Sequence, residues 1–194
     1  MSTLQQSKIT VAMIDNKSLY SYNLCNGFKK FEDKIQVIFC APKEKISLGA
    51  IKPPYCREVW SSYLYPFQIF KVITGLKPDI GHVQLEFNTF GPLHTIALFP
   101  FLLILLRLSG AKVVVTVHFT VPKNRLIIND LTGKSLFSVS PTVMMLILTL
   151  LYRFTNLFSH KIIVHSFVFK EWLSRYYKVN LNKVYVIPHG VVSE

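Results

Sequence analysis

Several features that mark common protein classes are scarce in this 194-residue sequence. It has only three cysteines, Cys25, Cys40 and Cys56, which form neither a metal-ligand pair nor an even-numbered disulfide framework. Charged residues make up 16% of the chain and hydrophobic residues 51%, a balance that excludes a disordered protein. We therefore expect a globular protein with reduced, mostly buried thiols.

Familiar nucleotide-binding and export motifs are also missing. No Gly-x-Gly occurs, so the dinucleotide fingerprint cannot be built. Gly133-Lys134-Ser135 resembles the end of a P-loop, but Ile128 stands where the first glycine is required. The N-terminus, MSTLQQSK, lacks the charged start and apolar middle of a signal peptide, so we expect a cytoplasmic protein.

Acidic residues are few: 10 Asp and Glu stand against 22 Lys and Arg, a net charge of +12. Such an excess favours an anionic partner, although a merely solvated basic surface is the alternative. The basic residues are spread along the chain and are not interleaved with aromatic residues, which argues against nucleic acid. A membrane surface and a phosphorylated ligand remain as candidate partners.

Two apolar runs, Ile96–Leu106 and Val143–Leu151, are the most hydrophobic parts of the chain. Each is about half the roughly 20 residues that a membrane-spanning helix needs. We expect both to be buried helices. Interfacial contact, with the protein peripheral at the inner face of the membrane, is the alternative that the basic charge leaves open.

Short β-branched runs alternate with longer helical stretches. The expected strands are 8–14, 34–40, 80–84, 112–117, 161–165 and 183–187, and the expected helices are near 18–31, 61–75, 92–108, 139–158 and 167–178. Ser166 is placed to cap the last helix, and Gly110 to end the third. This alternation predicts one α/β domain over residues 1–194, with a doubly wound, mainly parallel sheet and helices on both faces. The stretches 41–58 and 119–138 are predicted to be long loops.

In such a sheet the residues that follow each strand meet at one edge, where ligands bind. Three of the six histidines, His118, His165 and His189, fall there. The other candidates at this edge are Asp15, Asn16, Lys17, Ser18, Glu86, Asn88, Thr120, Ser166 and Gly190. A lone histidine in this place is more often structural than catalytic. Because several polar groups converge on the same edge here, we regard a functional and a structural role for His118 as equally plausible.

Four segments together resemble the N-terminal domain of family 4 glycosyltransferases of the GT-B class. They are Lys77–Gly91, Val113–Pro122, His160–Leu173 and Lys183–Val191. The resemblance spans residues 8–192, and its most specific elements are Gln84-x-Glu86, His118, His165-Ser166 and Pro188-His189-Gly190. The implied fold is one Rossmann-like half of a GT-B enzyme.

The resemblance implies transfer of a hexose from a nucleotide sugar, with retention, to a glycan or lipid-linked acceptor. His118 and Glu86 would be the catalytic residues. The substrate-binding residues would be Asn16, Lys17, Ser18, Asn88, Thr120, His165, Ser166, His189 and Gly190. The family resemblance implies no cofactor and no metal, because basic residues and a helix N-terminus hold the leaving diphosphate.

The chain departs from the family pattern in two places. The segment Asp15–Asn23, after the first strand, has no glycine, whereas the family often has a Gly-Gly loop there. The donor-binding domain would follow Val191, so we expect residues 1–194 to be an acceptor-side domain, inactive alone and completed by a C-terminal half or a second chain. The alternative is a non-catalytic Rossmann-like module that docks on a membrane or on a partner glycosyltransferase.

Overall fold

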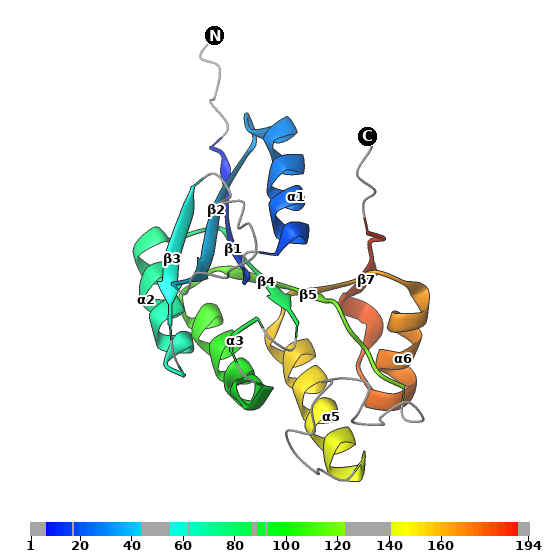
Figure 1. Ribbon diagram of the computed structural model, residues 1–194. Coiled ribbons are helices and arrows are strands. Elements are labelled where there is room, and N and C mark those ends of the chain that lie inside the picture. The colour runs from blue at the N-terminus through cyan, green and yellow to red at the C-terminus, as the bar shows by residue number, and fades with distance from the viewer. Residues whose placement is uncertain are drawn as a thin grey trace.

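The computed structural model describes residues 7–16, 18–43, 55–61, 63–86, 89–91, 93–122 and 141–189. Within them lies a seven-stranded sheet in the order β3-β2-β1-β4-β5-β6-β7, in which every neighbouring pair is parallel (Figure 1). The strands are β1 Ile9–Ile14, β2 Ile35–Pro42, β3 Cys56–Trp60, β4 Ile80–Leu85, β5 Lys112–Val117, β6 Lys161–Val164 and β7 Val184–Val186. The predicted α/β, doubly wound parallel sheet is confirmed.

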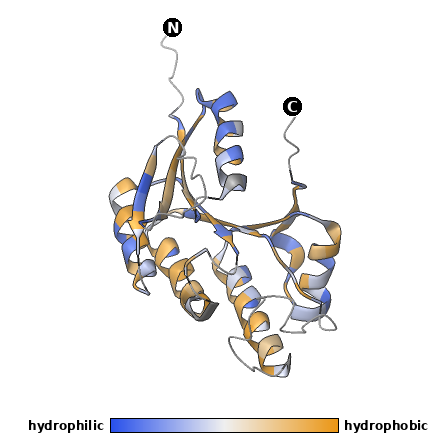
Figure 2. Cartoon of the chain, viewed as in Figure 1, coloured by the Kyte–Doolittle hydropathy of each residue, from blue (hydrophilic) through white to orange (hydrophobic). Residues whose placement is uncertain are grey.

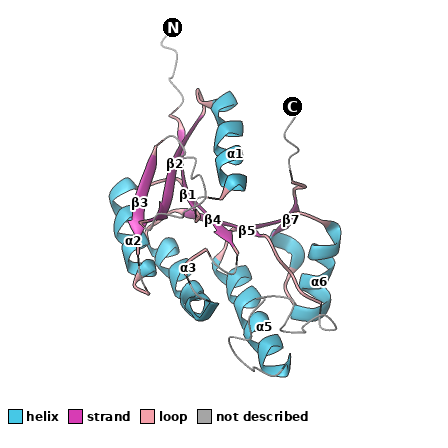
Figure 3. Cartoon of the chain, in the orientation of Figure 1, coloured by secondary structure: helices cyan, strands magenta, loops and turns pink. Residues whose placement is uncertain are grey.

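The helices are divided unequally between the two faces of the sheet (Figures 1 and 3). Helix α1 (Leu19–Phe28) lies alone on one face, which we call the α1 face. The opposite face, which we call the helix-rich face, carries α2 (Tyr65–Leu76), α3 (Phe99–Leu108), α5 (Pro141–Phe158) and α6 (Phe167–Tyr177). Short 3₁₀ turns complete the described elements: η1 Lys29–Phe31, η2 Leu93–Leu98 and η4 Leu181–Lys183.

This division follows from the strand order. The chain steps outward from β1 to β2 in one direction, and from β4 through β7 in the other. Because crossovers between parallel strands are right-handed, connections that step in opposite directions lie on opposite faces. The direction therefore reverses between β1 and β4, and this is the topological switch point at which sheets of this kind bind ligands.

The main hydrophobic core lies under the helix-rich face. Alternate residues of the central strands are fully buried there, among them Val83, Val115 and Val164, against Leu103 of α3 and Tyr65 of α2. A smaller cluster lies on the α1 face and contains Met13, Cys25, Phe39 and Ala41. The period of two along each strand therefore separates a large core from a small one.

The three cysteines are reduced thiols, as expected: Cys25 and Cys40 are buried and Cys56 is partly buried. Burial raises the pKa of Cys25 and of Cys40 to about 12, so both are protonated at neutral pH.

The six strands predicted from the sequence are all present, with ends that differ by at most two residues. The predicted loop 41–58 is wrong at both ends, because β2 runs to Pro42 and β3 begins at Cys56. Strand β3 is an edge strand with two exposed charged residues, Arg57 and Glu58, so it lacks the apolar run that marks the central strands. Of the other predicted loop, residues 123–138 lie outside the described part of the chain.

The two predicted helix ends were correctly placed. The side chain of Ser166 accepts a hydrogen bond from the Phe169 backbone N–H, so Ser166 caps α6. Gly110 follows α3 with φ of +88°, a conformation that glycine adopts without steric cost.

The two apolar runs that were predicted to be buried helices differ in how completely they are buried. Residues 96–106 enter η2 and α3, whose Leu102, Leu103 and Leu106 are fully buried, as predicted. In α5 only part of the run is buried: Leu148 and Leu151 face the core, whereas Leu146 and Leu150 are exposed. Figure 2 shows α5 as apolar along most of its length. None of the described helices is sufficiently long and apolar to span a bilayer.

Candidate functional site

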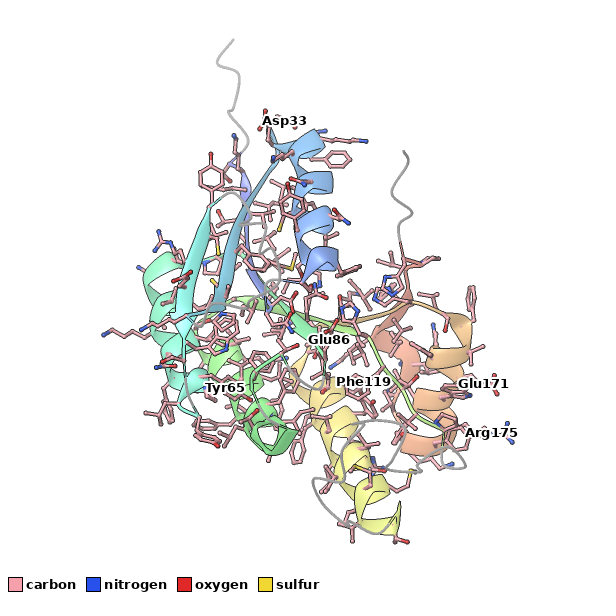
Figure 4. All side chains as sticks on the ribbon, viewed as in Figure 1. Asp33, Tyr65, Glu86, Phe119, Glu171 and Arg175 are labelled. Carbon is pink, nitrogen blue, oxygen red and sulfur yellow. The ribbon has the colours of Figure 1, made fainter. Side chains whose placement is uncertain are left out.

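The candidate site lies where the strands end at the carboxyl edge of the sheet. The parallel register places Leu85 beside Val117 and Val117 beside Val164, so Glu86, His118 and His165 follow neighbouring strands at the same level. His189 follows β7, three residues after Val186. Figure 4 labels Glu86 and Phe119 at the ends of β4 and β5. The prediction that Glu86, His118 and His189 lie along one edge is confirmed.

The imidazole of His118 is held by a hydrogen bond on one side and lies near a carboxyl group on the other. Its Nε2 lies 2.7 Å from Oε1 of Gln84, an oxygen that only accepts, so Nε2 carries the proton. Its Nδ1 lies 3.7 Å from Oε1 of Glu86. Burial lowers the pKa of His118 to about 4, with further lowering by His165, His189 and His82. At neutral pH His118 is therefore a neutral imidazole with its Nδ1 lone pair directed to the Glu86 side.

A cluster of aromatic rings surrounds His118. The His165 and His189 rings are stacked with centroids 3.6 Å apart, and the His118 centroid lies 4.8 Å from that of His165. Tyr20, from α1, presents its ring edge-on to all three histidines, at centroid distances of 4.8 to 5.5 Å. The cluster thus joins the first helix of the chain to its last described strand.

Asp15 forms the acidic side of the site at the end of β1. Its Oδ2 accepts hydrogen bonds of 2.5 Å from the hydroxyls of Ser18 and Ser21. Burial raises the pKa of Asp15 despite these bonds, because the carboxyl group is 1% exposed. The pKa of Glu86 is raised by burial first and by the charge of Asp15 second, so the two carboxyl groups influence each other across the switch point.

The other predicted site residues are divided between helix caps and groups without a hydrogen-bond partner. Ser18 caps α1, since its Oγ accepts from the Ser21 backbone N–H at 3.2 Å, and Ser166 caps α6. Asn16 Oδ1 and Thr120 Oγ1 are buried and have no hydrogen-bond partner among the described residues. The predicted site residues Lys17, Asn88 and Gly190 lie outside the described part of the chain.

A buried polar network leads to the site along the α1 face. His82 and Gln84, two residues apart on β4, point to this face, and His82 Nε2 lies 2.8 Å from the Thr116 hydroxyl of β5. Gln84 donates from Nε2 to the Met13 sulfur at 3.2 Å while its Oε1 accepts from His118. Gln84 is fully buried, so its two polar ends fix both the position and the tautomer of His118.

Comparison with known proteins assigns the family. The family model for Glycosyltransferase Family 4 matches residues 18–194, which is most of the chain. The chain belongs to glycosyltransferase family 4. No curated protein sequence gives a significant match to it.

Membership of family 4 places the chain among enzymes that transfer sugars from a donor to an acceptor. The site of this family 4 domain combines groups suited to that chemistry: a fixed neutral imidazole, two carboxyl groups with raised pKa values, and the N-termini of α1 and α6. Imidazole and carboxylate groups hydrogen-bond sugar hydroxyls, and helix N-termini attract anions such as phosphate.

Three residues of this family 4 site were not among the residues singled out as catalytic or substrate-binding: Tyr20, Gln84 and Asp15. Gln84 had a signal in the sequence, because His82 and Gln84 alternate with apolar residues on a buried strand and so mark a polar face. Asp15 directly follows β1, where ligands are expected. Tyr20 lies inside a helix, and no local pattern of the sequence indicates its approach to the histidines.

Proposed function

We propose that this family 4 domain transfers a hexose from a nucleotide sugar, with retention, to a glycan or lipid-linked acceptor. The observation that carries this proposal is the neutral His118, whose Nε2 is fixed by Gln84 while its Nδ1 lies 3.7 Å from Oε1 of Glu86. A preorganised hydrogen-bonding group of this kind stabilises charge that develops on a sugar in the transition state. In this proposal Glu86 orients the sugar hydroxyls.

The remaining site residues have supporting parts in the proposal. Ser18 and Ser166 act through the helices that they cap, because both helix N-termini lie at the same edge and favour the phosphates of the donor. Asn16, Thr120, His165 and His189 offer polar groups to substrate at this edge, together with Lys17, Asn88 and Gly190 by their place in the sequence. The transfer itself uses no metal ion or cofactor.

We propose that a donor-binding domain outside these 194 residues completes the cleft, in the same polypeptide or in a second chain. The family resemblance supports this, because in a GT-B enzyme the transition state forms between two domains. Positioning of the donor and electrostatic stabilisation of the leaving group both need that second half. Residues 1–194 alone are expected to bind a nucleotide sugar with only roughly millimolar affinity.

A transfer assay with radiolabelled nucleotide sugars and membrane extract as acceptor tests the proposal. The chain is assayed alone and together with the downstream half. We expect turnover only in the second case, and His118→Ala should then lower the rate about 100-fold, the scale for one preorganised donor. The matched control is His160→Gln, because His160 lies at the opposite end of β6 and accepts from the Val113 backbone N–H.

Two outcomes of this assay would contradict the proposal. Robust turnover by residues 1–194 alone would overturn the half-enzyme interpretation. A rate for His118→Ala within a few-fold of the parent, with His160→Gln also unchanged, would show that His118 is structural.

We further propose that the domain docks on an anionic membrane surface through α5. Leu146, Ile147, Leu150, Phe154 and Leu157 are 38 to 61% exposed, and their spacing places them on one side of the helix. An exposed apolar stripe of this length is typical of helices that lie in the membrane interface. The net charge of +12 adds attraction to anionic lipids, and docking would bring a lipid-linked acceptor to the site.

Sedimentation with liposomes tests the docking. The chain should bind vesicles of anionic lipid at low salt and be released as ionic strength rises. The double variant Leu146→Glu, Leu150→Glu should bind at least about tenfold less, because two apolar side chains no longer enter the interface. Leu108→Glu is the matched control: Leu108 is 71% exposed but ends α3.

The two assays separate the candidate functions. Membrane binding without transfer, in the presence of the downstream half, would favour the non-catalytic docking module. Binding by the double variant equal to that of Leu108→Glu would overturn docking through α5.

A further inference from the structure

Three histidine side chains meet at one point of the α1 face. His118, His165 and His189 follow β5, β6 and β7, and each offers a ring nitrogen that lies within 4.8 Å of the other two. These strands are neighbours in the sheet, and Val117 pairs with Val164 and Val164 with Val186. The parallel register, and not a local sequence motif, therefore builds the cluster.

Hydrogen bonds orient two of the three rings. Nε2 of His118 donates to Oε1 of Gln84 at 2.7 Å, and Nδ1 of His165 donates to the backbone oxygen of Ile187 at 3.0 Å. In each neutral ring the other nitrogen, Nδ1 of His118 and Nε2 of His165, then carries a lone pair. Histidines that bind metals have this arrangement, with one nitrogen on the ion and the other N–H donated to a carbonyl or carboxylate oxygen.

Two lone pairs of this cluster meet no hydrogen-bond donor among the described residues. His165 is nine-tenths buried, and its Nε2 has no hydrogen-bond partner among the described residues. A buried acceptor without a partner is destabilising, because it has lost its hydrogen bonds to water and gained none in the protein. On the other side of the cluster, Nδ1 of His118 faces Oε1 of Glu86 at 3.7 Å, so an acceptor meets an acceptor. A cation between these groups would satisfy both.

We propose that His118, His165 and His189 bind one divalent transition-metal ion, with Zn²⁺ as the species that fits best. Imidazole nitrogens suit Zn²⁺, Cu²⁺ and Ni²⁺, whereas Mg²⁺ and Ca²⁺ require oxygen ligands. Zn–N bonds are about 2.0–2.1 Å, so tetrahedral ligand atoms lie about 3.4 Å apart. The ring nitrogens, which lie within 4.8 Å of one another, therefore need to approach by up to about 1.4 Å. The His165 and His189 rings also need to rotate out of their stacked arrangement, so that both lone pairs point to the ion. Glu86 and Asp15 supply negative charge beside the site.

Metal binding departs from the expectation, drawn from the family resemblance, that the protein holds no metal. It does not depend on the proposed sugar transfer, because the ligand set stands on the geometry alone. If His118 also acts in transfer, the ion occupies its Nδ1 and excludes the sugar. Zn²⁺ would then inhibit the transfer and take no part in it.

Calorimetric titration of the purified chain with Zn²⁺ alone tests the proposal, and Mg²⁺ serves as the negative arm. We expect one Zn²⁺ per chain and no heat with Mg²⁺. His189→Gln should weaken the affinity at least about 100-fold, because removing a residue that merely supports a ligand already costs 10–100-fold. His189 is exposed, so this variant should fold normally. His160→Gln is the matched control and should leave the affinity unchanged.

A second measurement distinguishes this site from adventitious binding to the thiols. Co²⁺ bound by three imidazoles gives a visible absorption band, which should disappear in His189→Gln and His165→Gln and persist in Cys56→Ser. Gln84→Leu should weaken Zn²⁺ binding about tenfold, because Gln84 fixes the His118 tautomer. Failure to bind Zn²⁺, or binding that His189→Gln leaves unchanged, would overturn the proposal.

Discussion

The two faces of the sheet carry different side chains on the same strands. Toward the helix-rich face, β4 to β6 present aliphatic residues such as Val83, Val115 and Val164, all fully buried. Toward the α1 face the same strands present His82, Gln84 and Thr116, also buried but joined by hydrogen bonds. The first face stabilises the domain by apolar burial, whereas the second fixes polar groups in position for the site.

The largest effect on stability is expected on the helix-rich face. Leu103 of α3 is fully buried in the main core, so Leu103→Ala should lower the free energy of unfolding by about 3–4 kcal/mol through lost burial and a cavity. Val114→Ala, a half-buried position on the α1 face of β5, should cost less than about 1.5 kcal/mol. Urea denaturation measures both. An equal loss of unfolding free energy in the two variants would show that both faces of the sheet contribute equally to stability.

The polar face should be the source of pH dependence. Burial lowers the pKa of His82 from 6.5 to about 4, so between these values the unfolded chain binds a proton that the folded chain does not. Stability is therefore complete above about pH 6.5 and falls as pH decreases, by at most about 1.4 kcal/mol per pH unit for one such group. His82→Gln keeps a polar group near Thr116 and should make the slope shallower. An unchanged slope would assign the dependence to other groups.

The two serine caps provide a matched pair. Ser166→Ala removes one cap hydrogen bond of α6 and should cost about 1 kcal/mol. Ser18→Ala removes the cap of α1 and also a donor to the buried Asp15, so it should cost about 2 kcal/mol. Thermal or urea unfolding of the two variants compares them directly. A smaller loss for Ser18→Ala than for Ser166→Ala would contradict the role given to Asp15.

The smallest effect is expected at the outward side of α5. Leu150 is 47% exposed, so Leu150→Gln should change the free energy of unfolding by no more than about 0.5 kcal/mol. Leu148→Gln, two residues earlier on the inward side, should be strongly destabilising because it buries an amide in the core. If Leu150→Gln lowers the free energy of unfolding as much as Leu148→Gln does, then Leu150 is buried against another part of the protein.

Much of this architecture could be predicted from the sequence because its strands are apolar runs bounded by polar residues. Strand β3 could not, since an edge strand needs an apolar contact on only part of its length and Cys56–Trp60 carries two charges in its middle. At the site, the parallel topology alone predicted that Glu86, His118 and His189 share an edge. The contacts of Tyr20 and the anchoring of His118 by Gln84 depend on how a helix packs on the sheet, which no local pattern encodes.

The position of β1 in the strand order has a consequence for synthesis of the protein on the ribosome. β1 pairs with β2, which follows soon after, but its other neighbour is β4, with Val11 beside Ile80. At about 5–20 residues per second, roughly 3 to 14 seconds separate the appearance of these two residues. During this interval the apolar strand ITVAMI has an open edge, which is a template for aggregation. The nascent chain therefore depends on protection of this edge until β4 emerges and joins the two halves of the sheet.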